Sequence, residues 1–249
     1  MFGLFETKTS SRKAELQPNL LLAAVLSAGL SALAMPGKIG WWPLLFFALV
    51  PLLRLCLNTR PLRSAAGGFL FGVTYHLALL YWILIVLGQY GGLSLWVSVP
   101  ALVLLASYMA VYSAIFCGLL SMLAGRAQVQ GRSAVVFVWI APLLWVGLDY
   151  LRSVLFTGFP WMDLGYGLFD QPWLIQVADL GGHHLVTFFL VLVNGLVVTV
   201  LDWQRDRRQH CQGTGRRLLL PAGVLLIAAL GYSLVRYQTV AATISHSLQ

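Results

Sequence analysis

Apolar residues occur in seven long runs, and the segments between them hold most of the charged residues. A helix that crosses a bilayer needs about 20 predominantly apolar residues. The runs are close to that length or exceed it. They therefore predict an all-α membrane protein, a polytopic helical bundle of about seven transmembrane helices. The runs cover residues 19–35, 41–57, 65–87, 94–124, 134–151, 185–201 and 218–235.

Several runs carry a local signal that changes their predicted shape. Pro43 and Pro51 fall in the second run, which is therefore expected to be short or kinked. The third run contains Gly68-x-x-x-Gly72, a spacing that favours close contact between two helices. The fourth run is longer than a straight span requires. We expect it to tilt, to kink at Pro100 or to project from the membrane.

Composition supports a membrane domain and sets its boundaries. Of the 249 residues, 59% are hydrophobic and 10% are charged, whereas soluble domains contain about 25% charged residues. We divide the chain into a polar tail (1–18), a seven-span domain (19–235) and a final segment (236–249). Within the seven-span domain, residues 152–184 form the predicted extracytoplasmic loop.

The net charge of +8 does not indicate nucleic acid, because the basic residues follow the predicted membrane topology. If the N-terminus is cytoplasmic, only Lys38, Arg152 and Arg236 of the 16 basic residues fall in outer segments. Cytoplasmic loops of membrane proteins are enriched in Lys and Arg. This pattern predicts a cytoplasmic N-terminus and a periplasmic C-terminus, and it places loop 152–184 outside the cytoplasm.

The segment around this loop concentrates the polar and turn-forming residues. Asp149 and Arg152 are three residues apart and share a helix face, so they predict either a structural ion pair or a site for a lipid headgroup. The Gly158-Phe159-Pro160-Trp161 sequence cannot continue a helix. By itself it indicates an interfacial turn, and Tyr166 extends the aromatic character of this segment.

Other polar residues give weaker signals. Adjacent residues such as His183 and His184 diverge on a helix, and no third ligand has a suitable spacing, so we predict no metal site. His76 and Asn194 lie within apolar runs and are expected to face the bundle interior, where they can bond to neighbouring helices.

The chain also lacks an obvious nucleophilic site, so we predict no catalytic residues. A nucleophile, a base and an orienting group must meet on one side of the membrane. The candidate residues are widely separated, with no CxxC pair, and they cannot form a Glu-Lys-Cys set. They are Glu6, Glu15, Lys8, Lys13, Lys38, Cys56, Cys117 and Cys211.

The sequence LRSVLFTGFPWMDLGYG (151–167), the segment QVADLGG (176–182) and the run that includes Asn194 resemble apolipoprotein N-acyltransferase. The resemblance implies a bacterial inner-membrane enzyme without a cofactor. Its acyl donor would be a phospholipid, typically phosphatidylethanolamine, and its acceptor the N-terminal diacylglyceryl-cysteine of a lipoprotein.

The resemblance also implies roles for particular residues. Trp161 matches a tryptophan that the family needs for function, and Gly158 and Pro160 match its flanking turn. Asp149 stands where the family usually has glutamate, and Ser153 where it usually has glycine. The implied substrate-binding residues are Asp149, Arg152, Gly158, Phe159, Pro160, Trp161 and Tyr166.

In this family the chemistry belongs to a nitrilase-like domain after the seventh span, with a Glu-Lys-Cys triad. Residues 236–249 would be the start of that domain, and residues 239–249 resemble its first strand. We therefore expect a membrane half that is inactive alone: a fragment, a truncated product, or one part of a pair with a separate nitrilase-like chain. The alternatives are a non-catalytic membrane scaffold or subunit and, less favoured, a small transporter, because only His76 is ionisable near a span centre.

Overall fold

The computed structural model describes residues 19–37, 39–129, 132–205 and 212–247, and all elements in these ranges are helical. The α-helices are α2 (Leu20–Ala34), α3 (Val50–Asn58), α4 (Pro61–Leu79), α5 (Trp82–Ile85), α6 (Leu95–Val129), α7 (Ser133–Val135), α8 (Ala141–Val154), α9 (Ala178–Arg205) and α10 (Gln212–Ser247). The 3₁₀ segments are η1 (Trp42–Phe46), η4 (Leu155–Thr157), η5 (Leu164–Leu168) and η6 (Ile175–Val177). The π-helical segments are η2 (Val86–Tyr90) and η3 (Val136–Ile140).

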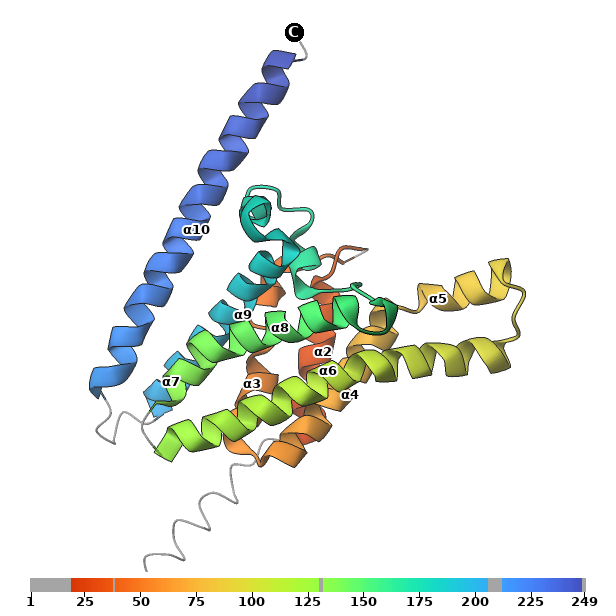
Figure 1. Ribbon diagram of the computed structural model, residues 1–249, viewed down its shortest axis with the longest axis horizontal. Helices are drawn as coiled ribbons and strands as arrows, with labels where there is room; N and C mark the ends of the chain where they lie inside the picture. The colour runs from red at the N-terminus through yellow and green to blue at the C-terminus, as the bar shows by residue number, and fades with distance from the viewer. Residues whose placement is uncertain (1–18, 38, 130–131, 206–211, 248–249) are drawn as a thin grey trace, which may run out of the picture.

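Helices α2, α3, α4, α6, α8 and α9 pack into a bundle, whereas α10 runs along its side (Figure 1). Helix α5 and the first turns of α6 form an arm that leaves the bundle (Figure 1). The irregular segment 155–177 lies between α8 and α9 at one end of the bundle. This arrangement places the loop over the ends of α4, α8 and α9.

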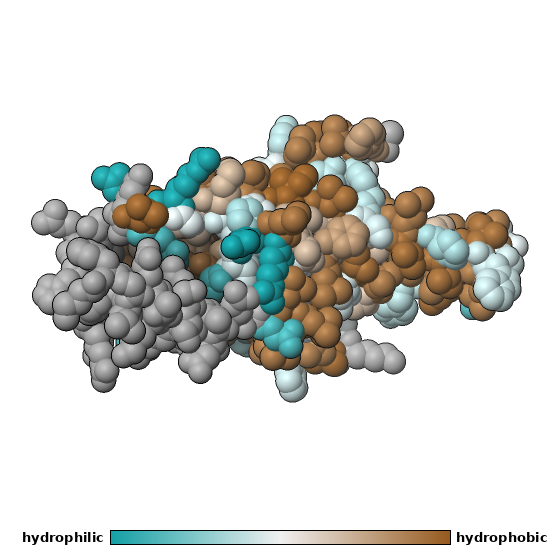
Figure 2. All heavy atoms as spheres, turned by 90° about the horizontal axis from the view of Figure 1, so that it is seen from below, coloured by the Kyte–Doolittle hydropathy of each residue, from teal (hydrophilic) through white to brown (hydrophobic). Residues whose placement is uncertain are grey.

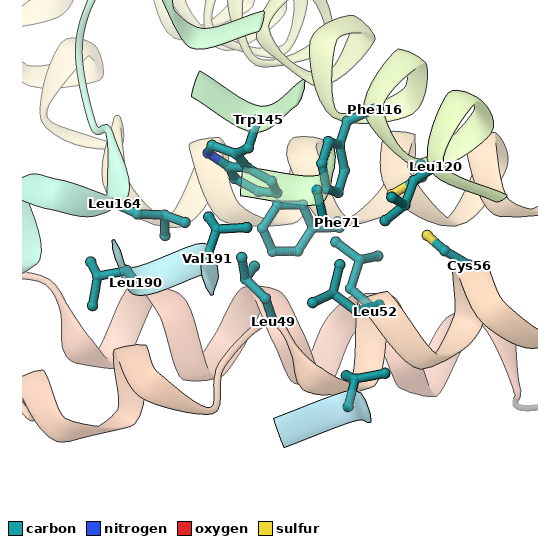
Figure 3. Close-up of a cluster of buried hydrophobic side chains, with 14 of the residues drawn as sticks. Leu49, Leu52, Cys56, Phe71, Phe116, Leu120, Trp145, Leu164, Leu190 and Val191 are labelled. Carbon is teal, nitrogen blue, oxygen red and sulfur yellow. The ribbon is translucent and has the colours of Figure 1, made fainter. Parts of the chain in front are cut away.

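Aromatic rings from three helices fill the centre of the bundle. Trp145 of α8 makes edge-to-face contacts with Phe116 of α6, at 4.7 Å between ring centroids, and with Phe71 of α4, at 6.2 Å. Leu49, Leu52 and Val191 approach this group from the opposite side (Figure 3). Phe71 also stacks on Tyr75, one turn along α4, and so the core continues directly to the loop end of the bundle.

The expectation of seven spans is met only in part. All seven apolar runs are helical, but within the described residues four helices are long and apolar enough to cross a membrane, or five when the bent pair α4 and α5–η2 counts as one span. The first two runs form short helices, Leu20–Ala34 and Trp42–Asn58. The second is interrupted between η1 and α3, in keeping with the predicted effect of Pro43 and Pro51.

The predicted glycine contact is confirmed. A Cβ atom at Gly72 would lie 2.6 Å from Cα of Ala110 in α6, and one at Gly68 would collide with the Ser113 carbonyl oxygen. Only a hydrogen at these positions allows the two backbones to approach so closely. The pair α4–α6 is accordingly the most extensive helix contact in the bundle.

The third and fourth runs differ in how they end. The third was expected to be one helix over 65–87, but α4 stops at Leu79 and the chain bends by 51° into α5 and η2. The bend directs Trp82 toward the loop, where its ring contacts Trp161. The start of the fourth run projects from the bundle, which fits the third of the predicted options. Helix α6 remains helical through Pro100, and Trp96 near its start is 90% exposed.

The predicted strand after residue 236 was wrong, because α10 continues as a helix to Ser247. The β-branched residues there favour strands, but a strand needs a neighbouring strand to pair its backbone, whereas a helix pairs its own. The hydroxyls of Thr239 and Thr243 donate to the carbonyl oxygens of Val235 and Thr239, at 3.0 Å each, and so fit within the helix.

On the face seen in Figure 2, hydrophobic residues cover much of the described surface. Large exposed hydrophobic side chains occur on α2, α6, α8 and α10. Soluble monomers rarely expose contiguous apolar patches of more than a few hundred Å². The surface is therefore that of a protein surrounded by lipid.

Candidate functional site

The segment 155–177 is held in a tight path by three residues with positive φ. Phe156 has φ +50°, Gly158 +74° and Met162 +62°. A Cβ at Gly158 would clash with the Ser153 carbonyl oxygen, so only glycine fits the turn that follows α8. The Tyr75 hydroxyl donates to the Met162 carbonyl oxygen at 2.9 Å, and this bond helps to hold the unusual backbone of Met162.

On its outer side the segment forms one wall of an aromatic groove of about 620 Å³. Trp161 and Trp82 face each other with ring centroids 5.4 Å apart, and Phe159 stacks on Trp161 at 6.0 Å. Trp161 is 48% exposed and Tyr166 40%, so both can contact a ligand. The groove is lined by Met35, Pro36, Leu79, Tyr81, Trp82, Pro160, Trp161, Met162 and Tyr166.

On its inner side the same segment closes a buried polar cluster around Arg152. The Arg152 guanidinium contacts Asp149 Oδ1 at 3.2 Å, as the i, i+3 spacing predicted, and pairs with Asp163 from the loop. Arg152 is 4% exposed and Asp163 2%. Since a buried charge is costly unless paired, Arg152 and the two carboxylates depend on one another.

His76 completes the contacts of this guanidinium. Its Nδ1 lies 2.7 Å from the Gly72 carbonyl oxygen, and its Nε2 lies 3.3 Å from Arg152 Nη1. A carbonyl oxygen can only accept and a guanidinium can only donate. His76 is therefore the neutral tautomer with its proton on Nδ1. Its burial inside the bundle confirms the orientation predicted from the sequence.

A small polar cavity of about 30 Å³ lies beneath this cluster. It is bordered by Trp145, Asp149 and Arg152, whose Nε1, Oδ2 and Nε atoms have no hydrogen-bond partner within the described part of the chain. One water needs roughly 10–15 Å³ of such volume and two to four polar partners. The cavity therefore suits one or two bridging waters.

Burial governs the electrostatics of Asp163. Removal from water raises the pKa of this carboxyl to about 6, although the Arg152 guanidinium acts to lower it. Burial also raises the pKa of Tyr166, and the Asp163 charge adds to that shift. Burial of the Asp163 carboxylate thus costs free energy that its partners must offset, and those partners fix the loop just after Trp161.

The structure sorts the seven predicted site residues into two adjoining groups. Pro160, Trp161 and Tyr166 line the aromatic groove, Phe159 supports Trp161, and Gly158 forms the turn before them. Asp149 and Arg152 belong to the polar cluster beneath it. The two groups meet at Met162 and Asp163, where one side chain faces the groove and the next is buried.

Asp163, Trp82 and Tyr75 are among the residues of these sites that the sequence does not indicate. Asp163 resembles any loop carboxylate, although its position two residues after Trp161 is a usable signal. The apolar run 65–87 predicts Trp82 within a continuous span. Tyr75 gave no signal, because its bond to the loop depends on how α4 packs against it.

His183 and His184 also differ from expectation. They lie just after a break in α9 at Gly181 and Gly182, and Asp163 supplies the third group that the sequence spacing did not offer. Cys56 and Cys117 are buried and free, whereas Cys211 lies outside the described residues.

The chain is similar to known proteins over the residues of both the aromatic groove and the polar cluster. A family profile, "Apolipoprotein N-acyltransferase N-terminal domain", matches residues 27–196. The chain is 39% identical over 211 residues to an apolipoprotein N-acyltransferase of Geobacter metallireducens, and the alignment covers 85% of this chain and 39% of that protein. A protein of the same name from Rhodopirellula baltica is 35% identical over 221 residues, covering 83% of this chain and 37% of the relative.

The chain thus spans under two fifths of the length of these relatives. The profile match extends from α2 into α9 and includes the loop, the groove and the polar cluster. The chain therefore belongs to the apolipoprotein N-acyltransferase family and corresponds to its N-terminal membrane domain.

Proposed function

We propose that this chain is the lipid-binding membrane half of an apolipoprotein N-acyltransferase. Its substrates would be a phospholipid acyl donor of the phosphatidylethanolamine type and a diacylglyceryl-lipoprotein acceptor. The observation that carries the proposal is the aromatic groove, which opens beside the loop end of a lipid-facing bundle.

The groove has the size and lining that a lipid substrate requires. Its volume of about 620 Å³ falls within the roughly 300–1,000 Å³ of small-molecule sites. Leu79, Met35 and the indoles provide apolar walls for acyl chains, and the hydroxyls of Tyr81 and Tyr166 are available near a headgroup. Trp161 can combine both functions, because an indole has an apolar face and one N–H donor.

The polar cluster would act on this groove by positioning its wall. Asp163 pairs with Arg152, and Tyr75 holds the Met162 carbonyl oxygen. These contacts come from α8 and α4 and fix the backbone directly after Trp161. We therefore assign Arg152 and Asp149 a positioning role and not direct contact with substrate.

The acyl-transfer step is proposed to lie outside these 249 residues, since the positions of their glutamates, lysines and cysteines along the sequence do not predict a Glu-Lys-Cys set. The purified chain should then produce no N-acylated lipopeptide from phospholipid and a diacylglyceryl peptide. Turnover above a control without enzyme would refute this part of the proposal.

We also propose that the seven apolar helices cross the inner membrane, with the N-terminus cytoplasmic and the C-terminus periplasmic. The basic residues support this: Arg60 and Arg63 lie at the α3–α4 connection and Arg126 and Arg132 at the α6–α7 connection, at the end opposite segment 155–177 (Figure 1). Single cysteines placed at positions 130 and 170 test the orientation. Labelling of position 130 from the periplasm would contradict it.

Trp161 provides the most direct test of substrate binding. In a version that includes a catalytic domain, Trp161→Ala should abolish acyl transfer while the melting temperature stays close to wild type, and Trp161→Phe should retain part of the activity. Trp96→Ala is the matched control, because Trp96 is a fully exposed tryptophan on the arm, outside the groove. Unchanged transfer by Trp161→Ala would reduce the motif to an interfacial turn.

A further inference from the structure

Three metal-ligating side chains converge where the loop meets the start of the regular part of α9. Asp163, His183 and His184 each offer one ligand atom, and these atoms lie within 4.8 Å of one another. His183 Nε2 is 2.7 Å from Asp163 Oδ2, and the two imidazole centroids are 4.0 Å apart.

The candidate ligand atoms also lack well-aligned hydrogen bonds. Asp163 Oδ2, His183 Nε2 and His184 Nδ1 are shielded from solvent, and the 2.7 Å contact between the first two does not have hydrogen-bond geometry. Buried polar atoms nearly always have a hydrogen-bond partner, so three such atoms in one place suggest a ligand that bonds to all three.

The fold explains why two adjacent histidines can point to one place. Gly182 has φ +66° and ψ −168°, a conformation reserved for glycine, and it interrupts α9 immediately before His183. The loop is fixed to the same helix by a 3.0 Å hydrogen bond from the Gly165 backbone N–H to the Thr187 hydroxyl. These features set Asp163 opposite the two rings.

The charges of the surroundings favour a cation. Arg152 is bound to Asp163 through Oδ1, which leaves Oδ2 toward the histidines. When both are ionised, Asp149 and Asp163 carry two negative charges against the single positive charge of Arg152, and His76 is neutral. The described part of the cluster therefore has an excess of negative charge unless a proton or a metal ion compensates it.

We propose that Asp163, His183 and His184 form a binding site for a divalent cation of the Zn²⁺ type. One carboxylate and two imidazoles are a ligand set that suits Zn²⁺, which commonly takes three protein ligands and one water. Arg152 holds the second carboxylate oxygen as an outer-shell partner. The site is reachable, because 30% of the His183 side chain is exposed.

A bound ion would tie the loop to α9 next to the aromatic groove. Tyr166, which lines the groove, stacks on His183 with ring centroids 4.9 Å apart and an interplanar angle of 18°. The ion would thus stiffen the groove wall, and its binding does not require lipid in the groove.

The test is titration of the chelator-treated full chain, carrying no polyhistidine tag, with ZnCl₂ by calorimetry. We expect one Zn²⁺ per chain, and a loss in affinity of roughly 100-fold or more in His184→Gln, since loss of even an outer-shell partner costs 10–100-fold. The matched control replaces His210 and His246 by glutamine and should bind as wild type. Co²⁺ absorption should report a four-coordinate site in wild type and not in His184→Gln.

Two results would overturn the proposal: no binding by wild type, or equal binding by wild type and His184→Gln. The contact between His183 and Asp163 would then be an ion pair that a proton completes. A second measurement needs no variant: Zn²⁺ should protect His183 and His184 of the wild-type chain from modification by diethylpyrocarbonate. Modification at the same rate with and without Zn²⁺ would also count against the site.

Discussion

Adding a single methyl group at Gly72 should separate α4 from α6. The new Cβ would lie 2.6 Å from Ala110 Cα and 2.8 Å from Ala110 Cβ. The helices must move apart by roughly 0.8 Å before ordinary contact is restored, and backbone atoms cannot rotate away as a side chain could. Overpacking of this kind costs about 1–3 kcal/mol.

Helix propensity opposes this cost, since alanine is favoured over glycine by about 1 kcal/mol in a helix interior. The net loss for Gly72→Ala should therefore be at most about 2 kcal/mol. For a chain of this size that corresponds to a fall in melting temperature of up to roughly 8 °C. Gly68→Ala should act in the same direction, and the double variant should lose less than the sum, because one separation relieves both clashes.

Gly147→Ala is the matched control. Gly147 lies in the middle of α8, and a Cβ there would meet nothing within 4 Å, so only the gain in propensity remains. Melting of all variants should be followed by far-UV circular dichroism in one detergent at one heating rate, because membrane proteins often unfold irreversibly. If Gly72→Ala and Gly147→Ala shift the midpoint in the same direction, the reading of the α4–α6 contact is wrong.

Further variants test the loop end and the core. Arg152→Met should destabilise the chain by about 3–5 kcal/mol, because it removes the cation that pairs with two buried carboxylates; a melting temperature within 2 °C of wild type, roughly 1 kcal/mol or less, would show that the cluster is not structural. Asn194→Leu removes the acceptor of the Leu49 backbone N–H at 2.9 Å and should cost about 1–3 kcal/mol, whereas Thr199→Val, which affects a bond within its own helix, should change the midpoint little. Gly158→Ala forces a side chain into φ +74° and ψ 144°, at a cost of about 1–3 kcal/mol, and should speed proteolysis of the loop; unchanged cleavage would contradict this.

Local sequence patterns were sufficient for most of the helices and for one of their contacts. Long apolar runs predict helices in lipid, because a helix pairs its own backbone without water. The spacing of Gly68 and Gly72 predicted a close approach, since two glycines four residues apart leave a flat surface on one helix face. The pair Asp149 and Arg152 was predictable for the same reason: its geometry depends on a single helix.

Span lengths and the third run were less predictable. Hydropathy shows where apolar residues occur along the chain. It does not show where a helix bends, because a bend depends on the residues that the helix end contacts in the folded protein. Leu79 ends α4, and Trp82 then turns toward Trp161, which is 79 positions further along the chain. The strand expected after residue 236 failed for a related reason, because strand propensity has no effect without a partner strand.

The sequence by itself determined the helical membrane architecture and the aromatic turn at Pro160 and Trp161, because those features arise from residues close together in the chain. Only the tertiary structure brought Asp163 to Arg152 and His183, or Trp82 to Trp161. These partners come from different helices and from the loop. Their distances depend on how the bundle packs, and no spacing along the chain records that packing.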